Sequence, residues 1–162
     1  MSLLDLEMNQ KNYIKILAFC IIIVCIILVL YYVSLLTYKT FTLEEGTVVA
    51  NIGEQDMNVH IDILEHQKGD LAIEIAGWAY KENEKIKNIN SNYVLKNTEN
   101  GQMYLLRTRY EENINVPEEY KISGLHARAI VLGMPEGRYE VYVLYKNNKN
   151  DVLANTGIHV DI

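Results

Sequence analysis

The chain has 162 residues and a formal net charge of −6, and 49% of its residues are hydrophobic. This length leaves room for one folded domain besides a membrane segment, and an acidic domain has no long-range attraction for nucleic acid or anionic lipid. We therefore expect no nucleic-acid partner. The 2 cysteines, Cys20 and Cys25, lie in an apolar segment, so the polar part of the chain has no cysteine for a disulfide or a thiolate metal site.

The first predicted element is the uncharged apolar segment 16–38, in which only Ser34 and Thr37 are polar. As a helix rising about 1.5 Å per residue it would measure roughly 34 Å, against about 30 Å for the hydrocarbon core of a bilayer. This length favours a transmembrane helix in contact with the lipid bilayer over a buried core helix. Residues 1–15 then form a short tail on one side of the membrane.

Lysines near the two ends of the segment predict its orientation. Lys11 and Lys15 precede the segment, whereas only Lys39 follows it closely, and basic flanks tend to stay cytoplasmic. We expect a single-pass protein of the cell membrane with a cytoplasmic N-terminus and an extracytoplasmic C-terminal domain. A cleaved signal peptide is the alternative, but its apolar region normally has about 7 to 15 residues, and residues 34–37 make a poor cleavage site.

Beyond the segment, apolar and polar residues alternate with a period of two, which is typical of β-strands. Residues 39–57 are a linker or a first edge strand, and residues 58–162 form the folded domain. Turn residues at 67–70 and 97–101 predict a pair of hairpins. The strands that we expect are 59–64, 71–80, 93–95, 103–110, 125–132, 138–146 and 152–162.

About seven short strands without a helical period predict an all-β fold, namely an antiparallel immunoglobulin-like sandwich, with a small barrel as the alternative. In a sandwich, the inward side chains of both sheets form the core. The core positions that the alternation predicts are Ile73, Ile75, Leu106, Val141 and Val143.

Several short motifs in this region support a family resemblance. They are IAGWAY at 75–80, YVL at 93–95, YLLRTR at 104–109, GLHA at 124–127 and PEGRYEV at 135–141. Their order resembles that of small membrane-anchored immunoglobulin-like β-sandwich modules in the cell-envelope proteins of Gram-positive, low-GC bacteria. Such modules occur beside surface-polysaccharide machinery. The resemblance covers most of residues 58–162 and implies no catalytic residues.

The single tryptophan, Trp78, has two interpretations. On an exposed face beside Tyr80 it would form a flat platform on which a sugar ring stacks. On an early central strand it would instead fill the core, with Gly77 marking a bulge that turns it inward, and we favour the core. Tyr142 has the parity opposite to the core valines of its strand, so it is the better candidate for a surface contact.

All four arginines fall within a short stretch of predicted strands, at Arg107, Arg109, Arg128 and Arg138. A patch of guanidinium groups would suit a phosphate-bearing or uronic-acid glycan, or an acidic loop of a partner. The alternative, which we favour, is pairing with the nearby glutamates Glu111, Glu112, Glu118 and Glu119. The predicted ligand contacts are Trp78, Tyr80, Tyr142, Arg107, Arg109 and Arg128.

No motif in the sequence indicates catalysis. The histidines are scattered without zinc-ligand spacing, and no pair of carboxylates is singled out, so we predict no enzyme, no metal and no cofactor. The favoured function is a binding module for cell-envelope polysaccharide or a cell-surface partner, which would gather aromatic side chains on one face. A structural accessory of another membrane protein, such as a polysaccharide-assembling glycosyltransferase, would expose aliphatics or a sheet edge. A membrane-anchored hydrolase, the third possibility, needs a pocket with converging acids.

Overall fold

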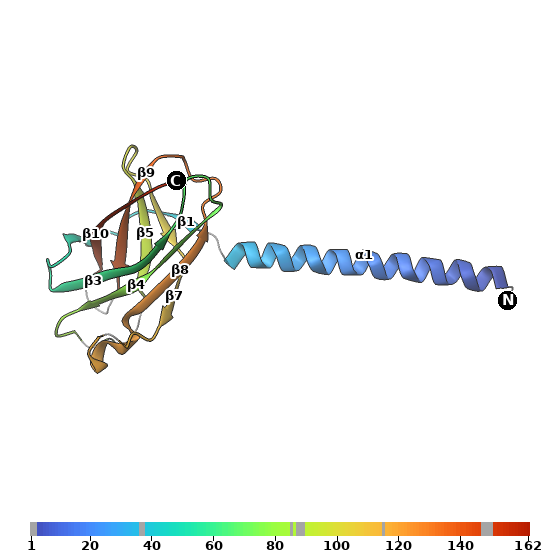
Figure 1. The fold of residues 1–162 in the computed structure, drawn as a ribbon, viewed down its shortest axis with the longest axis horizontal. Coiled ribbons are helices and arrows are strands. Elements are labelled where there is room, and N and C mark those ends of the chain that lie inside the picture. Colours follow the sequence, from blue (N-terminus) through green and yellow to red (C-terminus); the bar gives the residue numbers. More distant parts are fainter. Residues whose placement is uncertain (1–2, 36–37, 85, 87–89, 115, 147–150) are drawn as a thin grey trace. The chain divides into compact units, whose positions relative to one another are not determined.

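A computed structural model describes residues 3–35, 38–84, 86, 90–114, 116–146 and 151–162. The chain divides into two compact units, Met1–Leu35 and Leu36–Ile162, which are an apolar helix and a β domain (Figure 1).

Helix α1 (Leu3–Leu35) has 33 residues, so it begins well before the predicted span and ends three residues before its expected end. Its segment Asn12–Tyr31 is long and apolar enough to cross a membrane, and none of it is buried within the structure. Apolar side chains lie on all sides of this segment, whereas a helix at the surface of a soluble domain carries them on one stripe. By length and composition α1 is a membrane anchor or a signal sequence.

The β domain consists of two sheets that pack face to face (Figure 1). The six-stranded sheet has the order β1 (Tyr38–Phe41), β6 (Met103–Leu106), β5 (Asn92–Asn97), β9 (Arg138–Tyr145), β10 (Val152–Asp161) and β2 (Val48–Asn51). The four-stranded sheet has the order β3 (Met57–Glu65), β4 (Ala72–Lys81), β8 (Gly124–Ile130) and β7 (Thr108–Glu111), and the 3₁₀ helix η1 (Glu118–Ser123) precedes β8.

The described residues thus form ten strands where the sequence predicted about seven. The additional ones are β1 and β2 at opposite edges of the six-stranded sheet, and β7, because the predicted strand 103–110 is divided at Arg107. All paired neighbours run antiparallel except β2 and β10, which are parallel. Both predicted hairpins are confirmed, as β3 with β4 and β5 with β6.

A buried threonine holds the chain where it passes from one sheet to the other. Thr108 Oγ1 accepts a hydrogen bond from the backbone N–H of Tyr93 at 3.0 Å and donates one to the carbonyl of Leu106 at 3.2 Å. These bonds satisfy polar groups that the change of sheet removes from water, as burial requires.

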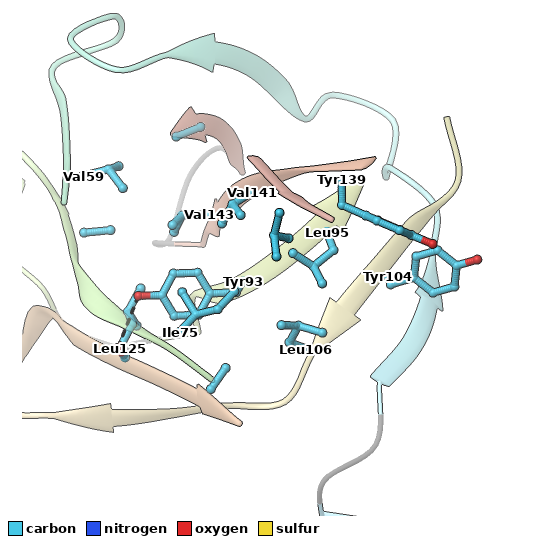
Figure 2. Close-up of a cluster of buried hydrophobic side chains, with 14 of the residues drawn as sticks. Val59, Ile75, Tyr93, Leu95, Tyr104, Leu106, Leu125, Tyr139, Val141 and Val143 are labelled. Atoms are coloured by element: carbon cyan, nitrogen blue, oxygen red, sulfur yellow. Dashed lines mark hydrogen bonds between the residues drawn. The ribbon is translucent and has the colours of Figure 1, made fainter. Parts of the chain in front are cut away.

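The predicted core is confirmed, since Ile73, Ile75, Leu106, Val141 and Val143 are all fully buried between the sheets. Figure 2 shows the ring of Tyr93 reaching from β5 toward Ile75 and Leu125 on the opposite sheet. Its hydroxyl donates to the carbonyl of Leu125 at 3.3 Å, and burial raises the pKa of this phenol. Nearby, Tyr139 Oη donates to the carbonyl of Pro135 at 2.6 Å, which fixes the loop before β9.

A second apolar cluster covers the outer face of the six-stranded sheet. Its buried members are Val94, Tyr142, Leu144 and Leu153, with Phe41, Leu43, Met103 and Leu105 packed against them. Residues 42–47, here called the strap, join β1 at one edge of the sheet to β2 at the other, and Leu43 packs on the face that they cross. Lys146 Nζ holds the strap by an ion pair with Glu44 Oε1 at 3.1 Å.

Candidate binding face on the four-stranded sheet

Strand β4 determines what the outer face of the four-stranded sheet presents. Its buried positions are Ile73, Ile75, Gly77 and Ala79, so the residues between them point outward and are half-buried. Trp78 is one of these outward residues, so the core position that we favoured for it is wrong. Tyr80 follows on the same side.

The expected bulge exists, but it lies in β3 rather than at Trp78. The register between β3 and β4 shifts between Ile61 and Ile63, opposite Gly77. A Cβ on Gly77 would collide with the carbonyl oxygen of His60 and lie 2.9 Å from Cα of Ile61. Glycine is therefore needed here for the close approach of β3, and it does not turn Trp78 inward.

Four rings stack in one continuous row across this face, and we call His60, Trp78, Tyr80 and Tyr120 the aromatic row. His60 and Trp78 lie 5.6 Å apart between ring centroids, Trp78 and Tyr80 5.4 Å, and Tyr80 and Tyr120 4.1 Å, with interplanar angles of 30°, 20° and 13°. Tyr120 comes from η1, and its hydroxyl accepts a hydrogen bond from the backbone N–H of Asn83 at 2.9 Å. The row thus joins β3, β4 and η1.

The stacking decides which part of each ring a ligand can reach. Tyr80 has Trp78 on one side and Tyr120 on the other, so both of its ring faces are covered by protein. Ring edges, with their polarised C–H groups and the phenol hydroxyl, are what remains for a ligand. The flat platform expected from Trp78 and Tyr80 is therefore replaced by a row of edges.

Beside the aromatic row, a histidine bridges two carboxylates across three strands. His126 Nε2 lies 3.0 Å from Glu74 Oε1, and His126 Nδ1 lies 3.0 Å from Glu111 Oε1. These two contacts link β4, β8 and β7, and we call these three residues the His126 bridge.

Two of the predicted arginines lie on the same face. Arg109 is the cross-strand neighbour of His126, and Arg128 follows His126 by two residues on β8, with its Nε 3.8 Å from Glu74 Oε2. Arg107 is the residue between the end of β6 in one sheet and the start of β7 in the other. Arg138 begins β9 in the six-stranded sheet.

The pairing that we favoured for the arginines is wrong for the part of the chain that the structure describes. Arg128 pairs with Glu74, and none of the four arginines forms an ion pair with Glu111, Glu112, Glu118 or Glu119. Glu111 contacts His126 and Glu112 contacts Lys121 instead.

Tyr142 lies on the other sheet. It points outward from the six-stranded sheet, as its parity predicted, but the strap and its neighbours leave it only 5% exposed. Its hydroxyl donates to Glu140 Oε2 at 2.8 Å, and burial together with this carboxylate raises the pKa of Tyr142 to about 12. Because packed sheets are about 10 Å apart, one ligand cannot touch Tyr142 and Trp78 together.

A hollow of about 690 Å³ lies at the end of the face where β3 turns into β4, with Glu65, Asp70 and Arg128 in its lining. Glu65 and Glu74 are cross-strand neighbours there, which is the arrangement that a hydrolase would need. Both oxygens of Glu74 already have a partner in His126 or Arg128. Among the described residues, no group of three His, Cys, Asp or Glu is placed to hold a metal ion.

Sequence reasoning missed His60, Tyr120 and His126 as members of this face. Only the hairpin register, which sets His60 opposite Trp78, offered a signal in the sequence. No protein-family model matches the chain, and no curated protein or solved structure matches it significantly.

Proposed function

We propose that this protein is a non-catalytic, single-pass membrane-anchored module that binds cell-envelope glycan through the outer face of the four-stranded sheet. In this proposal α1 is an uncleaved anchor with a cytoplasmic N-terminus, and the β domain is extracytoplasmic. The observation that carries the proposal is that the aromatic row and two arginines share one open face, while the strap covers the outer face of the other sheet.

The aromatic row lies at one end of β4, and the hairpin turn that joins β3 to β4 lies at the other. Strand β4 starts next to Leu71, whose carbonyl accepts a hydrogen bond from Val131. Tyr38, the first residue of β1, donates to the neighbouring carbonyl of Leu132. Tyr80 lies eight residues beyond Ala72, or roughly 26 Å along the strand. The aromatic row is therefore near the end of β4 that lies farther from Leu71.

The chemistry of the face favours a glycan that carries anionic groups. Ring edges, the indole N–H and the phenol hydroxyls can contact the C–H and O–H groups of sugars. The guanidinium of Arg109 forms no ion pair with any described residue, and its planar fork fits a phosphate or a carboxylate. Because the domain is acidic as a whole, we expect short-range recognition rather than long-range attraction.

A structural accessory of another membrane protein is the second candidate. Tryptophan, tyrosine and arginine are also the side chains that contribute most at protein interfaces, so the same face could hold a protein partner. Edge strands β3 and β7 flank it. Binding to purified polysaccharide distinguishes these two candidate functions.

We also propose that the domain is an immunoglobulin-like sandwich. The partition of β3, β4, β8 and β7 from β6, β5, β9 and β10 supports this, because that class separates its strands in a comparable way. The hydrogen bond from Tyr139 at the start of β9 back to Pro135 supports it too, as a tyrosine at this corner is a hallmark of the class. An experimental structure with a different strand order would refute it.

The test is co-sedimentation of the full chain in detergent with purified cell-envelope polysaccharide. We expect Trp78→Ala and Arg109→Ala each to weaken binding about tenfold, since one such contact contributes about 1.4 kcal/mol. Arg138→Ala is the matched control, because it removes an arginine from the other sheet, and it should leave binding unchanged. If the folded chain does not bind the polysaccharide, or if Arg138→Ala weakens binding as much as the other two variants, glycan binding by this face is refuted and a protein partner is favoured.

A further inference from the structure

One ring face of Tyr80 is covered by Tyr120, a residue of η1. The two ring centroids lie 4.1 Å apart at an interplanar angle of 13°, which is the closest and most nearly parallel contact of the aromatic row. Carbon atoms in contact lie about 3.5 to 4.0 Å apart in any pair of molecules, so a sugar ring packed on Tyr80 would lie at the same depth. Tyr120 therefore occupies the volume that such a ring would take.

Two contacts of the Tyr120 side chain tie η1 to the end of β4. One is the ring stack with Tyr80, and the other is the hydrogen bond that Tyr120 Oη accepts from the backbone N–H of Asn83 at 2.9 Å. Lys121, the next residue of η1, pairs instead with Glu112 in the segment that leads into η1. Because both contacts with the end of β4 go through one side chain, a ligand that displaces this ring breaks both of them.

The position of η1 over the aromatic row leaves some of its own groups poorly satisfied. The hydroxyl oxygen of Ser123, its last residue, is buried and has no hydrogen-bond partner among the described residues. Ile122 is 42% exposed and interrupts the element with non-helical backbone angles. A buried hydroxyl without a partner costs free energy, so a position in which Ser123 reaches water offsets part of the cost of moving η1.

We propose that the face of Tyr80 under Tyr120 is a subsite for one sugar ring of the polysaccharide, and that η1 is a lid which this ring displaces. The inference rests on the proposed function. A ligand shifts an equilibrium only through contacts that differ between the two states, and the uncovered face of Tyr80 is such a contact. The covered state lowers the apparent affinity of the face in proportion to its population.

The first experiment measures binding of the full chain in detergent to purified cell-envelope polysaccharide. Tyr120→Ala uncovers Tyr80, so we expect it to bind at least about fivefold more tightly than the native chain, the lower end of usual coupling effects. Ile122→Ala is the matched control, because it removes an exposed side chain of η1 outside the aromatic row, and it should leave binding unchanged. If Tyr120 instead only supports the row, Tyr120→Ala should bind more weakly.

Hydrogen exchange measures the displacement in the native chain, without any variant. The backbone amide of Asn83 donates to Tyr120 Oη, so saturation with the polysaccharide should accelerate its exchange at least about threefold, where binding usually slows exchange. The amide of Asp70, which donates to the carbonyl of Gln67 in the turn at the other end of β4, is the control and should not change.

The two measurements separate the lid from the glycan face itself. Tighter binding of Tyr120→Ala together with faster exchange at Asn83 supports the lid. A folded Tyr120→Ala that binds no more tightly than the native chain, or an Asn83 amide that is unchanged or slowed in the bound native chain, overturns the lid but leaves the glycan face intact. If Tyr120→Ala does not fold, the exchange of Asn83 decides. If neither chain binds the polysaccharide, the subsite and the proposed function both fail.

Discussion

At the scale of single residues, Gly77 shows how an absent side chain determines the position of the aromatic row. The backbone of β3 occupies the space that a Cβ would need, and the bulge opposite Gly77 sets His60 over Trp78. Any larger residue at this position must push β3 away from β4. The row and the stability of the domain therefore depend on the same glycine.

We predict that Gly77→Ala lowers the free energy of unfolding by about 1 to 3 kcal/mol, the usual effect of overpacking a buried site. Urea unfolding followed by the emission of Trp78, the single tryptophan, measures this change. Ala76→Ser, on the outward side of the same strand, is the control and should change stability by less than about 0.5 kcal/mol. Equal stability of Gly77→Ala and the native chain would show that β3 does not approach β4 as closely as the structure has it.

The alternation of apolar and polar residues predicted whether most strand side chains face the core or the solvent, and the prediction for Trp78 was wrong. The alternation correctly predicted the buried positions of Val141 and Val143 and the outward direction of Tyr142. Trp78 has the parity opposite to Ile75, so the sequence already contained the signal that it points outward. The local alternation along β4 therefore outweighs the general tendency of tryptophan to fill sandwich cores.

At the scale of elements, the strap turns one outward sheet face into a second core. Tyr142 and Leu153 would be exposed without it, because nothing else in the described chain is placed to cross that face from edge to edge. Leu43 supplies the apolar contact, and Lys146 supports the strap through Glu44 and Asp151, at 3.1 and 2.8 Å. The hydrogen bond with Asp151 is the largest cause of the raised pKa of Lys146.

We predict that Leu43→Ala lowers the free energy of unfolding by about 1 to 2 kcal/mol, as expected for a half-buried leucine. It should also lower the pKa of Tyr142 from about 12 toward its ordinary value near 10, because burial is the main cause of the shift. Tyr142 holds its proton more tightly in the folded state, with a pKa of about 12, than in the unfolded state, where the pKa is about 10. Its contribution to stability is therefore fully present below about pH 10 and is lost as the pH rises toward 12. The variant should thus lose stability less steeply in that range.

Urea midpoints between pH 8 and 12 test both parts of this prediction. Val49→Ala is a suitable control, because Val49 is an exposed aliphatic residue on the neighbouring strand β2. It should leave the alkaline slope unchanged. If Leu43→Ala and the native chain show the same slope, then the strap does not shield Tyr142.

Neither the strap nor the division of strand 103–110 could be predicted from local sequence. Residues 39–57 were expected to form a linker or an edge strand, and they supply β1 and β2 at opposite edges of one sheet. Which edges they join is decided by pairing with β6 and β10, far away in the sequence. Likewise, Arg107 is not a turn residue, and the change of sheet there depends on the hydrogen bonds of Thr108.

At the scale of the whole molecule, the sequence predicted the division into an apolar helix and a strand-rich domain. Each part carries its own periodicity, continuous in one and alternating in the other, and such patterns are local. The order of strands within the sheets is a different matter, because alternation says which side a residue faces but not which strand lies beside it. The candidate face illustrates the limit, since it combines side chains from β3, β4, β7, β8 and η1.

The separation into two units predicts that the β domain folds without the helix. None of the segment Asn12–Tyr31 is buried, and the core residues that the structure describes come from the β domain. A chain of residues 36–162 should therefore unfold at the same urea concentration as the full chain, within about 0.5 kcal/mol in free energy. It should also lose any association with membranes.

A second truncation serves as the control for this comparison. A chain of residues 42–162 also lacks β1, which pairs with β6 and packs Phe41 on the outer cluster. It should be less stable by about 2 kcal/mol or more, because Met103 and Leu105 lose their cover and β6 becomes an edge strand. Loss of the cooperative transition already in residues 36–162 would contradict the independence of the domain. Stability that falls only in the second truncation would show that β1 belongs to the cooperative unit of the β domain and that the helix does not.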